Sequence, residues 1–186
     1  MPADAYLITM LAALVPATAY ACWKDCRTHR VANWLNASIA ATGLAAQWHW
    51  FGTHGLTQGL LGIAVGFALL FGLWLIRGMG AGDVKFMAAL GAWLGPMLTL
   101  YAVAAGGIFG GVLALGMIAV RRTWLQTGIN LAALFNKLSS ARTALSDFAS
   151  ARSLGRTSGV LPYAVPLTAG MWSVVVIHYC GWWDVL

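Results

Sequence analysis

Carboxylate chemistry in this chain can come only from aspartate, because the 186 residues include five acidic side chains and no glutamate. The lack of glutamate excludes the His-Glu-x-x-His metalloprotease signature, whose general base would be missing. The three cysteines are too few and too scattered for a disulfide framework or a four-ligand zinc site. We therefore expect no metal and no other cofactor. The acidic residues are Asp4, Asp25, Asp83, Asp147 and Asp184, and the cysteines are Cys22, Cys26 and Cys180.

Asp25 and Asp83 stand at the ends of apolar segments, where each has an ordinary structural explanation. Asp25, between Lys24 and Arg27, suits an interfacial charge, and Asp83 suits a helix N-cap. Two carboxylates that face each other in a restricted site do not both ionise easily, so they share a proton. The ionised one can then take a proton from water while the other donates to a substrate carbonyl. The alternative to both structural explanations is therefore aspartic-protease chemistry.

Few other residues compete for a catalytic role. Ser158 and His178, the nearest approach to a serine-protease pair, lie at opposite ends of one apolar segment and about 30 Å apart along a helix. The glycine-rich run before Asp83 is a poor phosphate-binding turn, because it follows an apolar segment and Lys85 lacks the Gly-Lys-Ser/Thr setting. We expect Gly80 and Gly82 to let the backbone approach a partner or substrate closely beside Asp83.

The elements that must position these residues are membrane-spanning helices. Hydrophobic residues make up 60% of the chain and charged residues only 9%, which is unlike a soluble domain. A helix crosses the bilayer core in about 20 apolar residues. The sequence predicts an all-α polytopic membrane protein with about six spans, the fourth of them short. They run approximately over Tyr6–Trp23, Trp34–Phe51, Leu56–Ile76, Val84–Leu94, Leu98–Val120 and Val160–Cys180.

The basic residues orient these spans. No Lys or Arg precedes the first span, which disfavours a signal peptide. All eleven basic residues lie in the stretches 24–33, 77–85 and 121–159, and the positive-inside rule places these in the cytoplasm. Both termini are then outside, and Asp25 and Asp83 share the cytoplasmic side at similar depth. The net charge of +6 reflects orientation and contact with membrane lipids, so a nucleic-acid partner is not expected.

We expect residues 1–186 to form a single membrane-embedded domain. Within it, apolar residues recur at helical spacing in the stretch 121–159, which predicts an amphipathic cytoplasmic helix on the inner leaflet. A Ser/Arg/Ala-rich loop is the alternative. A transporter that uses Asp25 and Asp83 as a proton or cation relay is the alternative function, although no internal repeat supports it and the spans carry no run of polar residues.

Three stretches carry a resemblance to a known family. Gly80-Ala81-Gly82-Asp83-Val84-Lys85 resembles the Gly-x-Gly-Asp-x-Lys motif of the type IV prepilin peptidases, which are membrane aspartic proteases. The stretch 25–33 is similar to the family's other signature, with Val31 and Ala32 in place of Ile-Pro. The stretch 161–166 is similar to a family Pro-Tyr-Gly segment, with Ala164 in place of Gly. Presenilin-like and signal-peptide-peptidase-like proteases share Gly-x-Gly-Asp, but their first Asp follows Tyr.

The resemblance implies that Asp25 and Asp83 are the catalytic pair. It also makes five residues candidates for binding substrate or orienting the site, namely Arg27, Asn33, Gly80, Gly82 and Lys85. The implied substrates are type IV prepilins or pseudopilins, cut at the cytoplasmic face of the bacterial inner membrane. Bifunctional members carry a large cytoplasmic insertion with paired Cys-x-x-Cys motifs after the first span. This chain has no such insertion, so we expect a peptidase without N-methyltransferase activity. The sequence does not indicate the oligomeric state.

Overall fold

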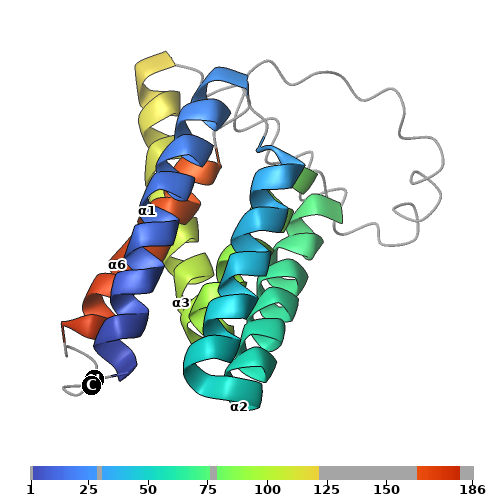
Figure 1. The fold of residues 1–186 in the computed structure, drawn as a ribbon. Helices are drawn as coiled ribbons and strands as arrows, with labels where there is room; N and C mark the ends of the chain where they lie inside the picture. Colours follow the sequence, from blue (N-terminus) through green and yellow to red (C-terminus); the bar gives the residue numbers. More distant parts are fainter. Residues whose placement is uncertain (1, 29–30, 76–78, 122–162, 181–186) are drawn as a thin grey trace. The chain divides into compact units, whose positions relative to one another are not determined.

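The computed structural model describes residues 2–28, 31–75, 79–121 and 163–180. These ranges contain four helices and no strand. The chain divides into two units, Met1–Gly111 with Pro162–Leu186 and Val112–Leu161, and the residues of the candidate site belong to the first. The helices are α1 (Pro2–Thr28), α2 (Asn33–Leu75), α3 (Ala81–Arg121) and α6 (Ala164–Tyr179), as Figure 1 shows.

Two of these helices are broken in the middle by glycine. Gly52 in α2 has φ 62° and ψ −145°, and Gly95 in α3 has φ 73° and ψ 176°. Only glycine adopts such positive φ values readily, and Pro96 directly after Gly95 removes a backbone donor as well. In Figure 1, α2 reverses its direction at its break. Each of the two helices therefore consists of two arms, which gives six helical arms in the described chain.

The helices match the predicted apolar segments. Both glycine breaks fall in the predicted gaps between segments. By length and composition, Asp4–Thr28, Asn33–Leu75 and Ala81–Met117 can each cross a membrane, and Ala164–Tyr179 is a shorter apolar helix. The prediction of an all-α membrane protein with several apolar helices is therefore confirmed. The number of crossings and their direction stay predictions.

Two of the boundaries that differ from the prediction affect the carboxylates. The first segment was expected to end at Trp23, but α1 continues to Thr28 because charge ends the apolar pattern without breaking the helix. The fourth was expected to start at Val84, but α3 starts at Ala81. Asp25 and Asp83 thus lie within helices. All but the first residue of the stretch 121–159 lie outside the described residues.

Glycine lets the arms pack closely. A Cβ added to Gly62 would overlap the Gly91 carbonyl, and one added to Gly170 would overlap the backbone of Gly106. The first contact joins the second arm of α2 to the first arm of α3, and the second joins the other arm of α3 to α6. Small residues serve this purpose in membrane proteins, where helices gain little from burying apolar surface. The two arms of α3 therefore hold α2 and α6.

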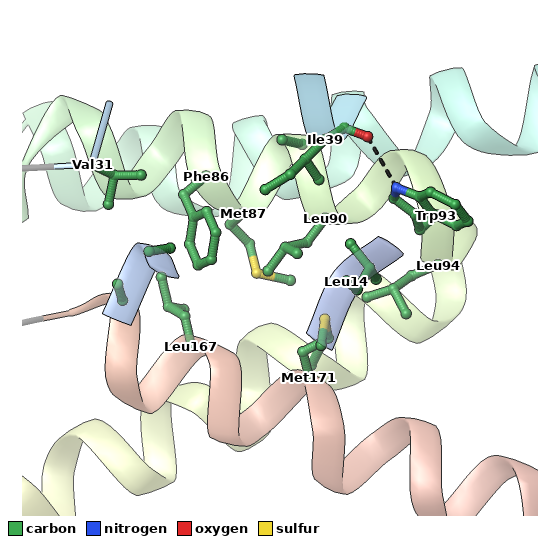
Figure 2. Close-up of a cluster of buried hydrophobic side chains, with 14 of the residues drawn as sticks. Leu14, Val31, Ile39, Phe86, Met87, Leu90, Trp93, Leu94, Leu167 and Met171 are labelled. Atoms are coloured by element: carbon green, nitrogen blue, oxygen red, sulfur yellow. Dashed lines mark hydrogen bonds between the residues drawn. The ribbon is translucent and has the colours of Figure 1, made fainter. Parts of the chain in front are cut away.

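The first arm of α3 supplies much of the buried core. Phe86, Met87 and Leu90 are fully buried, and they pack with residues of the other three helices. Figure 2 shows this cluster, with the Trp93 indole N–H donating to the Ile39 carbonyl at 3.0 Å. Asp83 lies three residues before Phe86 in the same arm, so the packing of this arm fixes the helix turn that carries Asp83.

Candidate active site

Asp25 is held between two helices. It lies near the end of α1 and is only 3% exposed. The backbone N–H of Ala164, the first residue of α6, donates to its Oδ2 at 3.0 Å. The first amides of a helix have no partner within the helix, and the positive end of the helix dipole favours an anion. The start of α6 therefore both orients the Asp25 carboxyl and stabilises its charge.

Asp83 is fixed by the glycine turn that precedes it. It is the third residue of α3 and is 9% exposed. Its carboxyl group accepts a hydrogen bond from the Gly80 backbone N–H, while its own N–H donates to the Gly80 carbonyl at 3.1 Å. This is one half of a capping box, in which the third helical residue reaches back to the N-cap N–H, because Gly80 has no side chain to supply the other half. Asp83 is thus not the N-cap itself, because its side chain reaches back to Gly80.

The two carboxyl groups come together in the structure. The charge of Asp25 acts directly on Asp83, although the two residues belong to different helices and are far apart in sequence. Both side chains are buried. Asp4, by contrast, is exposed in the first turn of α1, and Asp147 and Asp184 lie outside the described residues. Asp25 and Asp83 therefore lie within electrostatic range of each other, and their role as a catalytic pair stays a prediction.

The residues at the start of α6 reach both carboxyls. Tyr163 directly precedes α6 and is half-buried. Burial and the nearby charge of Asp83 raise the pKa of the Tyr163 hydroxyl. A tyrosine phenol is neutral near pH 7 even at its ordinary pKa, so Tyr163 has a proton to donate. Sequence reasoning assigned no role to Tyr163 or Ala164, and the only signal for them was the similarity of the stretch 161–166 to a family segment.

Two of the predicted orienting residues meet each other. The Lys85 ammonium group donates to the Asn33 side-chain oxygen at 3.4 Å, and both side chains are exposed. This contact joins the first turn of α2 to the first turn of α3. Arg27 lies elsewhere, with its guanidinium 4.7 Å from the centre of the exposed Trp23 ring. The structure thus pairs Lys85 with Asn33 and places Arg27 on the exposed side of α1.

Gly82, directly before Asp83, lies against the backbone of Val31. A Cβ added there would lie 3.6 Å from the backbone nitrogen of Val31, an ordinary contact. The Gly82 carbonyl also accepts a hydrogen bond at 3.3 Å from the side chain of Asn36. Asn36 was missed by sequence reasoning. The available signal was a polar residue within a predicted span, because such residues are costly at membrane depth.

The cysteines do not form a cluster with other metal-binding side chains. In the described part of the chain, no group of three or more His, Cys, Asp or Glu residues could hold a metal ion. Cys22 contacts α6, with its sulfur 3.4 Å from the Thr168 hydroxyl and 3.7 Å from the Ala164 carbonyl. Cys26 and Cys180 are exposed. Cys22 therefore lies in the contact between α1 and α6, as Asp25 does.

A comparison with protein families bears on this geometry. Residues 10–115 match the sequence model of the type IV leader peptidase family. The matched range is more than half of the chain and contains both Asp25 and Asp83. The chain belongs to the type IV leader peptidase family. No curated protein and no solved structure gives a significant match. The resemblance to the prepilin peptidases is thus confirmed at the level of the family.

The family match does not extend over the whole site of this leader peptidase. The matched range ends at residue 115, inside the second arm of α3. Tyr163 and Ala164 lie beyond it, yet they approach the same two carboxyls. The candidate active site therefore combines the matched part of the leader peptidase with the start of α6.

Proposed function

We propose that this leader peptidase is an intramembrane aspartic endopeptidase. Its substrates are type IV prepilins or pseudopilins, and it removes their leader peptide at the cytoplasmic face of the bacterial inner membrane. The observation that carries the proposal is the pair of buried carboxyl groups, Asp25 and Asp83, which interact from separate helices. Family membership supplies the substrate class.

The chemistry follows from the paired carboxyls. One of the two holds a proton and the other is ionised. The ionised carboxylate takes a proton from water as the water oxygen bonds to the scissile carbonyl carbon, and the protonated carboxyl donates to the carbonyl oxygen. As the tetrahedral intermediate collapses, the carboxyl that took the water proton passes it to the leaving nitrogen and the C–N bond breaks. A hydroxyl proton of the intermediate returns to the other carboxylate, which restores the starting state. The donors Ala164 and Gly80 hold the carboxyls in place before substrate arrives, which lowers the cost of reorganisation.

The remaining site residues act on the substrate. Gly80 and Gly82 lie just before Asp83, where the absence of side chains allows a peptide to approach the backbone. Arg27, Asn33 and Lys85 are exposed near the helix ends that carry the carboxyls, so we assign them to orienting the incoming prepilin. Because these side chains are exposed, a role in substrate binding is better supported than a role in bond cleavage.

We further propose six membrane crossings within a single domain, residues 1–186. The six helical arms support this number. The basic residues at the end of α1 and the start of α3 support a cytoplasmic location for these helix ends. Asp25 and Asp83 would then be cytoplasmic and both termini outside. The stretch 121–159 then lies on the inner leaflet as an amphipathic segment. In this arrangement the stretch 121–159 binds the surface of the inner leaflet, so membrane lipids are binding partners as well as the solvent of the spans.

We also propose that the enzyme lacks N-methyltransferase activity. Only residues 29–32 join α1 to α2, so this connection leaves no room for the cytoplasmic insertion with paired Cys-x-x-Cys motifs. The pilin should therefore be released with an unmethylated N-terminus.

The test is co-expression with a prepilin in a host without its own leader peptidase, followed by mass analysis of the pilin N-terminus. Asp25→Asn and Asp83→Asn should each reduce processing by about a thousandfold or more. Asp4→Asn, an exposed aspartate at the far end of α1, is the matched control and should process normally. Mature pilin from both site variants would refute the assignment. Proton or cation flux through liposomes without pilin processing would favour the relay transporter instead.

A further inference from the structure

Asn36 carries a buried hydrogen-bond acceptor with no partner. The residue lies in the first turn of α2 and is 5% exposed. Its side-chain nitrogen donates to the Gly82 carbonyl at 3.3 Å. Because a carbonyl can only accept, this bond sets the orientation of the amide and turns Oδ1 away from Gly82. In the described part of the chain, Asn36 Oδ1 is the one buried side-chain polar atom without a hydrogen bond.

An acceptor in this state costs free energy, because burial removes its water and nothing in the free protein replaces it. Buried polar groups are satisfied in the great majority of cases, so an exception calls for a specific explanation. Other buried polar side chains of this protein follow the rule. Gln47 donates to the Trp93 carbonyl at 3.1 Å, and the Thr99 hydroxyl donates to the Gly95 carbonyl at 2.6 Å.

The position of Asn36 connects this acceptor to the candidate active site. Its donor nitrogen is bonded to the residue directly before Asp83. One turn earlier on α2, Asn33 accepts from Lys85, so two contacts hold the start of α2 against the start of α3. The Asn36 amide is therefore fixed, through its nitrogen, to the helix turn that presents the Asp83 carboxyl.

Substrate chemistry supplies a partner for this oxygen. A peptide bond must leave a helix to be cleaved, and the amides around it then lose their backbone partners. In a water-poor membrane site such amides need acceptors from the enzyme. We infer that Asn36 Oδ1 accepts a hydrogen bond from a substrate backbone N–H beside the scissile bond. The inference rests on the proposed peptidase function and adds a substrate-binding residue that the motifs do not include.

The first experiment separates binding of substrate from stability. Asn36→Leu keeps a similar volume and removes both polar atoms, so the orphaned acceptor disappears from the free enzyme. The loss of the bond to the Gly82 carbonyl offsets the removal of the unpartnered acceptor, so we expect a melting temperature in detergent close to that of the wild type and a roughly tenfold fall in kcat/KM on a prepilin peptide. Gln47→Leu, a buried amide near the other end of the same helical arm, is the control and should keep the wild-type kcat/KM. Unchanged kinetics in Asn36→Leu would overturn the inference.

The second experiment identifies the donor. Synthetic prepilin peptides carry a backbone ester, which has no N–H, at one position at a time on either side of the scissile bond. One such ester should slow the wild-type enzyme by about tenfold and leave Asn36→Leu unaffected, because the variant has no acceptor to lose. Equal losses in both enzymes at every position would overturn the inference. Failure of the wild-type enzyme to cut the all-amide peptide would instead refute the peptidase function itself.

Discussion

The backbone N–H of Ala164 donates to the Asp25 carboxylate at 3.0 Å and joins residues 139 positions apart in sequence. Ala164 is fully buried, and its carbonyl oxygen lies 3.7 Å from the Cys22 sulfur. Both polar groups of this one peptide segment are thus engaged with α1. The orientation of Asp25 therefore depends on how closely α6 docks against α1.

This dependence predicts opposite outcomes for two substitutions at one position. Ala164→Leu adds a larger side chain to the closely packed contact between α6 and α1. The change should lower the free energy of unfolding by about 1–3 kcal/mol and move the N–H donor away from Asp25. Prepilin processing should fall by about tenfold or more. Ala164→Gly keeps the donor and should process prepilin at close to the wild-type rate. Normal processing by the Ala164→Leu enzyme would show that the contact is dispensable.

The close packing of α2 on α3 predicts which glycines tolerate a methyl group. Gly62→Ala places a Cβ against the Gly91 carbonyl and should destabilise the protein by about 1–3 kcal/mol. Gly72, on the same arm, has open space around its Cβ direction, so Gly72→Ala should be neutral or stabilising by up to about 1 kcal/mol. Thermal unfolding in detergent measures both. Equal melting temperatures for the two variants would argue against this helix contact.

The Lys85–Asn33 contact predicts non-additive effects on activity. Both side chains are exposed, so neither Lys85→Met nor Asn33→Ala should change stability by more than about 0.5 kcal/mol. Each should lower kcat/KM by less than about tenfold. Because the two groups contact each other, the double variant should have about the same kcat/KM as the less active of the two single variants. Fully additive losses would mean that the two residues act on the substrate independently.

The position of Arg27 predicts an effect on binding rather than on chemistry. Its guanidinium lies over an exposed indole ring, a contact of about 0.5–1 kcal/mol at such sites. Arg27→Gln should raise KM for prepilin and leave kcat within about threefold of wild type. Initial rates over a range of substrate concentrations separate the two constants. A fall in kcat of about a hundredfold would place Arg27 at the reacting carboxyls instead.

Much of the scaffold could be predicted because its signals are local. Long apolar runs mark the helices, and glycine and proline lie where α2 and α3 break. The pairing of Asp25 with Asp83 was predicted from the distribution of basic residues, since the positive-inside rule assigns both to the same membrane face. The end of α1 was misjudged because charged residues end an apolar pattern and still continue a helix.

The contacts around the carboxyls could not be predicted in the same way. Every residue except proline carries a backbone N–H, so nothing in the sequence distinguishes the Ala164 amide as the donor to Asp25. Asn36 is visible as a polar residue in an apolar run, but its bond to Gly82 and its unpartnered oxygen depend on how two helices pack. The family resemblance identified Lys85 and Asn33 separately as candidate site residues, but it did not predict that they contact each other.

The docking of α6 onto Asp25 bears on how intact members of this family are recognised. A shortened gene that stops after α3 would still encode both aspartates, the glycine-rich motif and every residue of the family match. It would nevertheless encode an enzyme without the Ala164 donor and without Tyr163. Counting such fragments as functional leader peptidases on their motifs alone would overestimate the processing capacity of a genome.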